Sequence, residues 1–107
     1  MNDRELLELA AKAAGIRHIE YTNDYDGRDG LMLCDEIGRH TSMWSPLTDD
    51  GDALRLAVKL FQDIYFWYFD NSVSVGNNVR VVCGDDQLAA TRRAIVRAAA
   101  EIGRNMA

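Results

Sequence analysis

Three aspartates fall within four positions at Asp49, Asp50 and Asp52, the densest group of carboxylates in the chain. Carboxylates packed this closely could hold a metal ion, activate a water molecule or begin a helix. Their Asp-Asp-Gly-Asp order lacks the alternating ligands and the final bidentate glutamate of a calcium loop. An apolar-periodic segment follows directly. We therefore expect Thr48 or Asp49 to cap a helix, and the other acids to lie in its first turn, where the helix dipole favours negative charge.

A second acidic segment reads NDYDGRDG and comes closer to a calcium loop. If Gly27 is aligned with the invariant turn glycine of such a loop, Asp24 and Asp26 occupy the third and fifth ligand positions. Thr22 then takes the first ligand position and Leu33 the last, where a glutamate is required. Two critical ligands are missing, so we predict a polar turn at this segment.

Cysteine and histidine are scarce and poorly spaced for catalysis or zinc binding. Cys34 and His40 could form a Cys–His nucleophile, but nothing in the sequence orients the pair. His18 is expected to be a packed or edge residue of a strand. Cys34 and Cys83 form no Cys-x-x-Cys motif, and no glycine loop matches a phosphate-binding pattern. We therefore predict no catalytic residues, no metal and no cofactor.

Arginines recur along the last apolar-periodic segment. Arg93, Arg97 and Arg104 are spaced by four and seven residues, which places them within about 40° of one another on a helical wheel. Two interpretations stay open. The three residues could form a solvated helix face whose late cations suit the C-terminal dipole, or they could contact phosphates or an acidic protein.

Aromatic residues are concentrated in the segment FQDIYFWYFD, which holds six of the nine in the chain. In a strand, alternate side chains point to opposite sides: Tyr65, Trp67 and Phe69 to one, Ile64, Phe66 and Tyr68 to the other. Both sides are apolar, so we expect a strand covered on two faces. The alternative is a partly exposed surface that docks a partner through Tyr65 and Trp67, because Trp and Tyr dominate binding hot spots.

Three helices are expected around these residues. The first runs from about Asp3 to Ala14 and stops at Gly15. The second runs from about Asp49 to Leu60 and has only a narrow polar stripe, so it should sit deep against a sheet. The third begins after Gly84, with Asp85 and Asp86 as caps, and ends near Gly103. Its predicted buried stripe is Leu88, Thr91, Ile95, Ala98, Ala99 and Ile102.

Strands fill the intervals between these helices. IRHIEYT and LMLCDEI are expected to be strands joined by the NDYDGRDG loop. After the aromatic strand and a turn at Asp70-Asn71, SVSVGNNVRVVCG forms one bent strand or two short ones around residues 76–78. The order is α-β-β-α-β-β-α. The length of 107 residues predicts a single domain over residues 1–107. We expect an α/β sandwich of the α+β type, with an antiparallel-rich sheet of about four strands flanked by three helices.

The composition of the chain limits the classes of function that it could have. The chain of 107 residues has a net charge of -5 and is 48% hydrophobic, as an ordinary soluble domain would be. Its longest apolar stretch, Ile64–Phe69, is far too short to span a membrane, and the charged N-terminus is unlike a signal peptide. We therefore expect a cytosolic protein. The net charge disfavours general nucleic-acid binding. Acids predominate in residues 20–52 and arginines in the last helix, so a local basic patch could still act.

Two blocks carry a resemblance. The first block is Trp44–Leu60, which reads W-x-PLTDDGDALRLAVKL, and the second is Ala90–Gly103, which reads ATRRAIVRAAAEIG. They resemble the phage α-β-α sandwich domain, a family of small phage and prophage proteins without a characterised function. The resemblance implies a phage or prophage origin and a sheet flanked by helices. It carries over no catalytic residues.

The sequence thus favours a small phage-encoded accessory protein that binds another macromolecule and performs no chemistry. Its expected partner is a host or phage protein, with no membrane contact, and it would act as a monomer or homodimer. One alternative is an inhibitor of a bacterial defence system whose acidic surface imitates nucleic acid. A further alternative is a nucleic-acid binder that uses the arginines of the last helix.

Overall fold

The structure, a computed structural model, describes residues 2–16, 18–23, 29–34 and 40–106 of the chain. Helices and strands alternate along it as α1 (Asp3–Ala14), β1 (His18–Asn23), β2 (Asp29–Cys34), β3 (His40–Trp44), α2 (Asp50–Lys59), β4 (Ile64–Trp67), β5 (Ser72–Val75), β6 (Val79–Val82) and α3 (Gln87–Arg104). Among the described residues, no helix is both long and apolar enough to cross a membrane.

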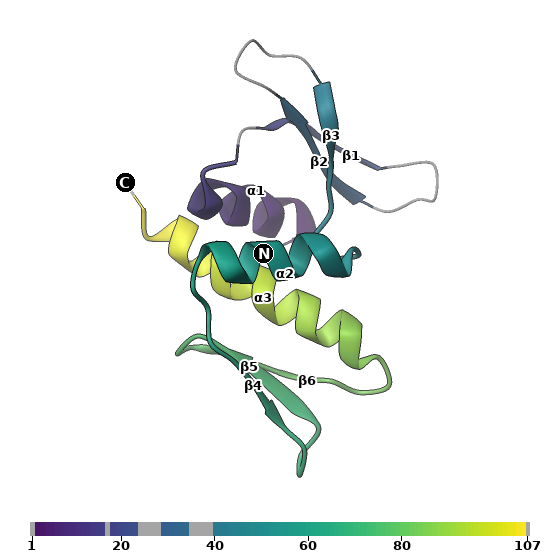
Figure 1. Cartoon of the computed structure of the whole chain (residues 1–107), viewed down its shortest axis with the longest axis vertical. Coiled ribbons are helices and arrows are strands. Elements are labelled where there is room, and N and C mark those ends of the chain that lie inside the picture. The colour runs from purple at the N-terminus through teal and green to yellow at the C-terminus, as the bar shows by residue number, and fades with distance from the viewer. Residues whose placement is uncertain (1, 17, 24–28, 35–39, 107) are drawn as a thin grey trace.

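The strands form two antiparallel sheets at opposite ends of the molecule, with the helices between them (Figure 1). One sheet has the order β1-β2-β3 and the other β4-β5-β6. The expected α+β class with three helices and antiparallel strands is confirmed. The strands differ in detail from the expected sheet of about four, because residues 40–44 add β3 and the strands divide into two separate sheets. Of the two alternatives for residues 72–82, the structure has two short strands with a turn at residues 76–78.

Helix ends follow the local signals. The Asn2 side chain caps α1 by accepting a hydrogen bond from the Glu5 N–H, and Gly15 ends this helix in the left-handed conformation with φ 69°. At the other end of the chain, the Asp86 side chain caps α3 by accepting from the Ala89 N–H. The expected boundaries of the first and last helices are therefore confirmed to within a residue or two.

The core is built around α3, which packs against α1, α2, β5 and β6. Its buried face is rich in small residues, including Ala94, Ala98 and Ala99, so the backbones of α1 and α3 approach closely. The approach is close at Gly103, since a Cβ atom there would lie 2.0 Å from the carbonyl oxygen of Leu9. Leu7 on α1 and Val96 on α3 are fully buried side chains of the same core.

Two burial predictions for the last helix are wrong. Leu88 is 63% exposed and Ile102 is 41% exposed, although both were expected in the buried stripe. The face of α3 that packs is the alanine-rich one, because only small side chains permit the close contact with α1. The larger residues Leu88 and Ile102 lie outside it.

The prediction that the second helix sits deep against a sheet is also wrong. α2 packs mainly on α3 and buries only Ala53, Leu56 and Ala57. Leu54 and Val58 are 59% and 65% exposed. With one principal neighbour, a helix covers only part of its circumference, so an apolar residue outside that part stays in contact with water.

Candidate functional site

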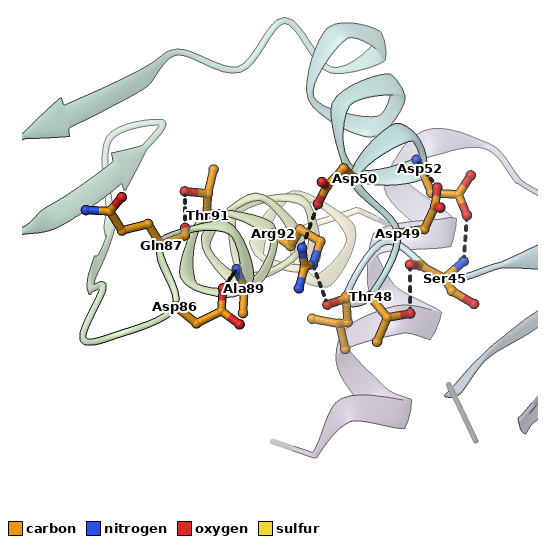
Figure 2. A network of polar contacts seen from close by, with 11 residues as sticks. Ser45, Thr48, Asp49, Asp50, Asp52, Asp86, Gln87, Ala89, Thr91 and Arg92 are labelled. Carbon is orange, nitrogen blue, oxygen red and sulfur yellow. Dashed lines mark hydrogen bonds and ion pairs between the residues drawn. The ribbon is translucent and has the colours of Figure 1, made fainter. Parts of the chain in front are cut away.

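The aspartate cluster begins α2 (Figure 2). The Asp49 side chain is the N-cap and accepts a hydrogen bond of 2.8 Å from the Asp52 N–H. Asp52 in turn accepts from the Ser45 N–H at 2.9 Å and pairs with Arg55 at 2.7 Å. Of the two residues expected as the cap, the structure selects Asp49. The Thr48 hydroxyl instead donates to the carbonyl oxygen of Ser45 at 3.4 Å.

Asp50 points toward α3 and pairs with Arg92 at 2.6 Å (Figure 2). The Arg92 side chain is only 16% exposed, and its Nε–H donates to the carbonyl oxygen of Leu47 at 2.9 Å. Arg92 therefore joins the middle of the chain to its last helix. Sequence reasoning missed this role, because nothing in the spacing of Arg92 shows that α2 begins beside it.

The other chemistry-bearing candidates are only partly placed. Residues 24–28 of the acidic loop lie outside the described residues, as do residues 35–39. Cys34 and His40 are facing partners in the β2–β3 ladder, but their side chains are not among those described. Within the described part of the chain, no group of three or more His, Cys, Asp or Glu residues could hold a metal ion.

The aromatic strand β4 lies at the edge of its sheet and is largely exposed, so the prediction that both of its faces are covered is wrong. Tyr65 is 58% exposed and Phe66, on the opposite side, is 63% exposed. The physical reason is that α3 packs on β5 and β6, while β4 has β5 as its main neighbour. Its hairpin with β5 projects away from the helices (Figure 1).

The sheet register gathers one set of side chains on the outer face. Tyr65 pairs with Ser74 and Ser74 with Arg80, while Trp67 pairs with Ser72 and Ser72 with Val82. Residues between these positions, such as Val73 and Val75, are fully buried on the inner face. We call the outer set the aromatic surface: Tyr65, Trp67, Phe69, Arg80 and Val82.

Ring contacts order the aromatic surface. The ring centroids of Tyr65 and Trp67 are 4.4 Å apart, and Phe69 meets Trp67 edge-on at 5.8 Å. The Trp67 indole N–H donates to the Ser74 hydroxyl at 3.1 Å. The Arg80 guanidinium lies 4.7 Å from the centre of the Trp67 ring, a cation–π contact. Trp67 is thus in contact with four side chains, those of Tyr65, Phe69, Ser74 and Arg80.

Arg80 is itself fixed by polar groups of the hairpin. It forms an ion pair with Asp70, and its Nε–H donates to the Ser72 hydroxyl at 3.0 Å. The Ser72 hydroxyl donates to Asp70 at 2.7 Å. The neighbouring Asn71 side chain donates to the carbonyl oxygen of Gly84 at 2.9 Å, tying the turn to the segment before α3. The aromatic surface therefore rests on a turn with many fixed contacts.

These contacts predict a pH-dependent arrangement at Asp70. The hydrogen bond from Ser72 and the positive charge of Arg80 hold the Asp70 pKa below its ordinary value of 3.8. Because this pKa is lower in the folded protein than in the unfolded chain, the interaction stabilises the fold above about pH 4 and is lost as the pH falls through the folded value. An NMR titration of the Asp70 carboxyl carbon should give a midpoint below 3.8, and Ser72→Ala should raise that midpoint. An unchanged midpoint in the variant would contradict the assigned cause.

The three arginines of α3 lie along a cleft. Arg93, Arg97 and Arg104 line it together with Glu101, Leu6 of α1, and Asn78 and Val79 before and in β6. Arg93 pairs with Asp3 at 3.1 Å and Arg104 with Glu101 at 3.4 Å. We call this concavity the arginine cleft. The helical spacing brings the three arginines to one face, as the sequence predicted, but the cleft itself arises from the neighbouring elements.

Comparisons with protein-family models, curated proteins and solved structures found no match.

Proposed function

We propose that the protein is a binding module that docks on a protein partner through its aromatic surface and performs no chemistry. The observation that carries the proposal is the fixed Trp67–Arg80 arrangement, in which a half-buried Trp67 ring lies against the exposed Arg80 side chain. A tryptophan, a tyrosine and an arginine lie together there, the residue types that dominate binding hot spots. Each aromatic side chain offers about 150–250 Å² of surface, so the partly exposed rings form a patch of several hundred Å². Patches of this size on monomers are often functional.

The charge of the aromatic surface favours a protein over a nucleic acid. Its cation, Arg80, is paired with Asp70, so the surface presents little positive charge to phosphates. The expected partner is therefore a protein with an apolar pocket that receives the rings. Ordering of Tyr65, Trp67 and Phe69 before binding lowers the entropic cost of association.

The proposal also includes the origin of the protein. The resemblance of Trp44–Leu60 and Ala90–Gly103 to the phage sandwich domain supports a phage- or prophage-encoded accessory protein acting in the host cytoplasm. The alternative of a defence inhibitor depends on acids in residues 20–52, and residues 24–28 and 35–39 of that stretch lie outside the described residues. The aromatic surface therefore supports docking on a protein more directly.

Site-specific cross-linking tests the proposal. A photo-reactive phenylalanine analogue is placed at Tyr65 and, as a matched control, at the similarly exposed Leu54 on α2. We expect a partner to cross-link in cells from position 65 and not from position 54. With that partner purified, Trp67→Ala should weaken binding by at least about tenfold, because the cost of removing a hot-spot tryptophan exceeds that of other contacts.

Leu54→Ala supplies the affinity control, since it removes an exposed apolar side chain from another surface. Thermal unfolding of both variants checks that each is folded. Equal affinity of Trp67→Ala and wild type, or cross-linking from position 54 alone, would refute the proposed surface.

A further inference from the structure

The arginine cleft is concave and lies between three elements. Its long side is α3, its walls are the first turn of α1 at Leu6 and the start of β6 at Val79, and its volume is about 590 Å³. Small-molecule sites in proteins commonly have volumes of about 300–1,000 Å³. The three arginines therefore line a hollow of ligand size instead of forming a convex ridge.

The charge of the cleft is opposite to that of the whole chain. Its lining holds three guanidinium groups and, among the described lining residues, the single carboxylate of Glu101, whereas the chain carries a net charge of -5. The ion pairs of Arg93 and Arg104 each use one guanidinium nitrogen, Nη2 and Nη1 respectively. A guanidinium has five N–H donors, so these pairs engage only part of the donor capacity of each group.

Arg97 lies between the other two arginines in the sequence and is exposed. In the described part of the chain, no carboxylate lies within ion-pair distance of it. The side chains on either side are held by Asp3 and Glu101, at 3.1 Å and 3.4 Å, which positions their guanidinium groups before a ligand arrives. An unpaired guanidinium flanked by two held ones is suited to bidentate contact with phosphate oxygens.

We propose that the arginine cleft binds a small phosphate-bearing ligand, with Arg97 as its main contact. Leu6 and Val79 supply an apolar wall for the part of the ligand that carries no charge. This site is separate from the aromatic surface and does not depend on the function proposed for that surface.

A small ligand is favoured over a nucleic-acid polymer by charge and shape. A polymer would follow many phosphates along a broad basic surface, and its affinity would come from releasing counterions at each contact. Here only three arginines line the cleft, and two of them are paired with the acids Asp3 and Glu101. Repulsion between the acidic protein and the remaining phosphates would oppose a longer contact.

Calorimetric titration with pyrophosphate, a nucleoside diphosphate and a short single-stranded DNA tests the inference. We expect both small phosphates to bind, with NMR amide shifts at Leu6 and Val79. Arg97→Gln should weaken pyrophosphate binding about tenfold, and Arg97→Lys less, because lysine keeps the charge but loses the planar fork. Arg55→Gln is the matched control, since Arg55 is an exposed arginine of α2 that does not line the cleft.

Three results would overturn the inference. One is the absence of binding of either small phosphate at millimolar concentration. Another is equal affinity of the Arg97→Gln and Arg55→Gln variants. The last is binding of the DNA alone with a steep salt dependence, which would assign the cleft to nucleic acid. None of these results bears on cross-linking from Tyr65.

Discussion

Alanine at position 103 is expected to lower the free energy of unfolding by about 3 kcal/mol. A Cβ atom at Gly103 would lie 2.0 Å from the carbonyl oxygen and 2.8 Å from the carbonyl carbon of Leu9. Both atoms belong to the backbone of α1, so no side-chain rotation can relieve the overlap, and the two helices must move apart. At an exposed helical position the same change would stabilise the protein by about 1 kcal/mol. The sign and the size of the change in unfolding free energy therefore both test the close contact.

Urea unfolding followed by circular dichroism measures this effect, and Gly51→Ala is its matched control. A Cβ atom at Gly51 would meet only side-chain atoms, the Arg55 guanidinium at 3.2 Å and the Asp49 carboxylate at 3.3 Å. The Arg55 side chain is 73% exposed and can swing away, and the Asp49 carboxylate needs to shift by only a few tenths of an ångström. The control should therefore change the free energy of unfolding by much less than Gly103→Ala does. If Gly103→Ala unfolds at the same urea concentration as the wild type, α1 and α3 do not pack as closely as described.

Asp52→Ala is expected to destabilise the protein by about 2 kcal/mol, because a buried hydrogen-bond donor then loses its acceptor. Ser45 is only 7% exposed, and its N–H donates to Asp52 at 2.9 Å. Alanine offers no acceptor at this position, so the N–H remains desolvated without a partner. The lost ion pair with Arg55 adds little, since the Arg55 side chain is exposed.

Asp52→Asn separates these two contributions. The asparagine keeps a side-chain oxygen that accepts from the Ser45 N–H, but it removes the charge that pairs with Arg55. We expect it to cost less than about 1 kcal/mol, well below the alanine variant. An asparagine variant as unstable as the alanine variant would show that charge, and not the hydrogen bond to Ser45, stabilises the start of α2.

Features governed by neighbouring residues could be predicted from the sequence. The stop at Gly15 and the caps at Asp49 and Asp86 follow from backbone groups that need partners within one turn. The common face of Arg93, Arg97 and Arg104 follows from helical spacing alone. Each of these predictions depends only on residues that are close together in the sequence.

Burial and sheet arrangement could not be predicted in the same way. The residues of β4 are apolar on both faces of the strand. A core strand and an exposed docking strand can have the same pattern. Only the position of β4 at a sheet edge, while α3 packs mainly on β5 and β6, decides between them. One local signal was available: Ser72, Ser74 and Arg80 alternate with valines, which marks an outer face beside Tyr65 and Trp67.

The central packing of α3 on α1 has a consequence for how the chain folds. Asp3 and Arg93, which pair across this contact, are 90 positions apart. The loop that must close before α1 gains its main neighbour is therefore long, and the entropy of closing it is lost before any burial compensates. The packing of α1 on α3 should therefore form late in folding, although both partners are helices. During synthesis, the apolar face of α1 would stay exposed to solvent until α3 has been made.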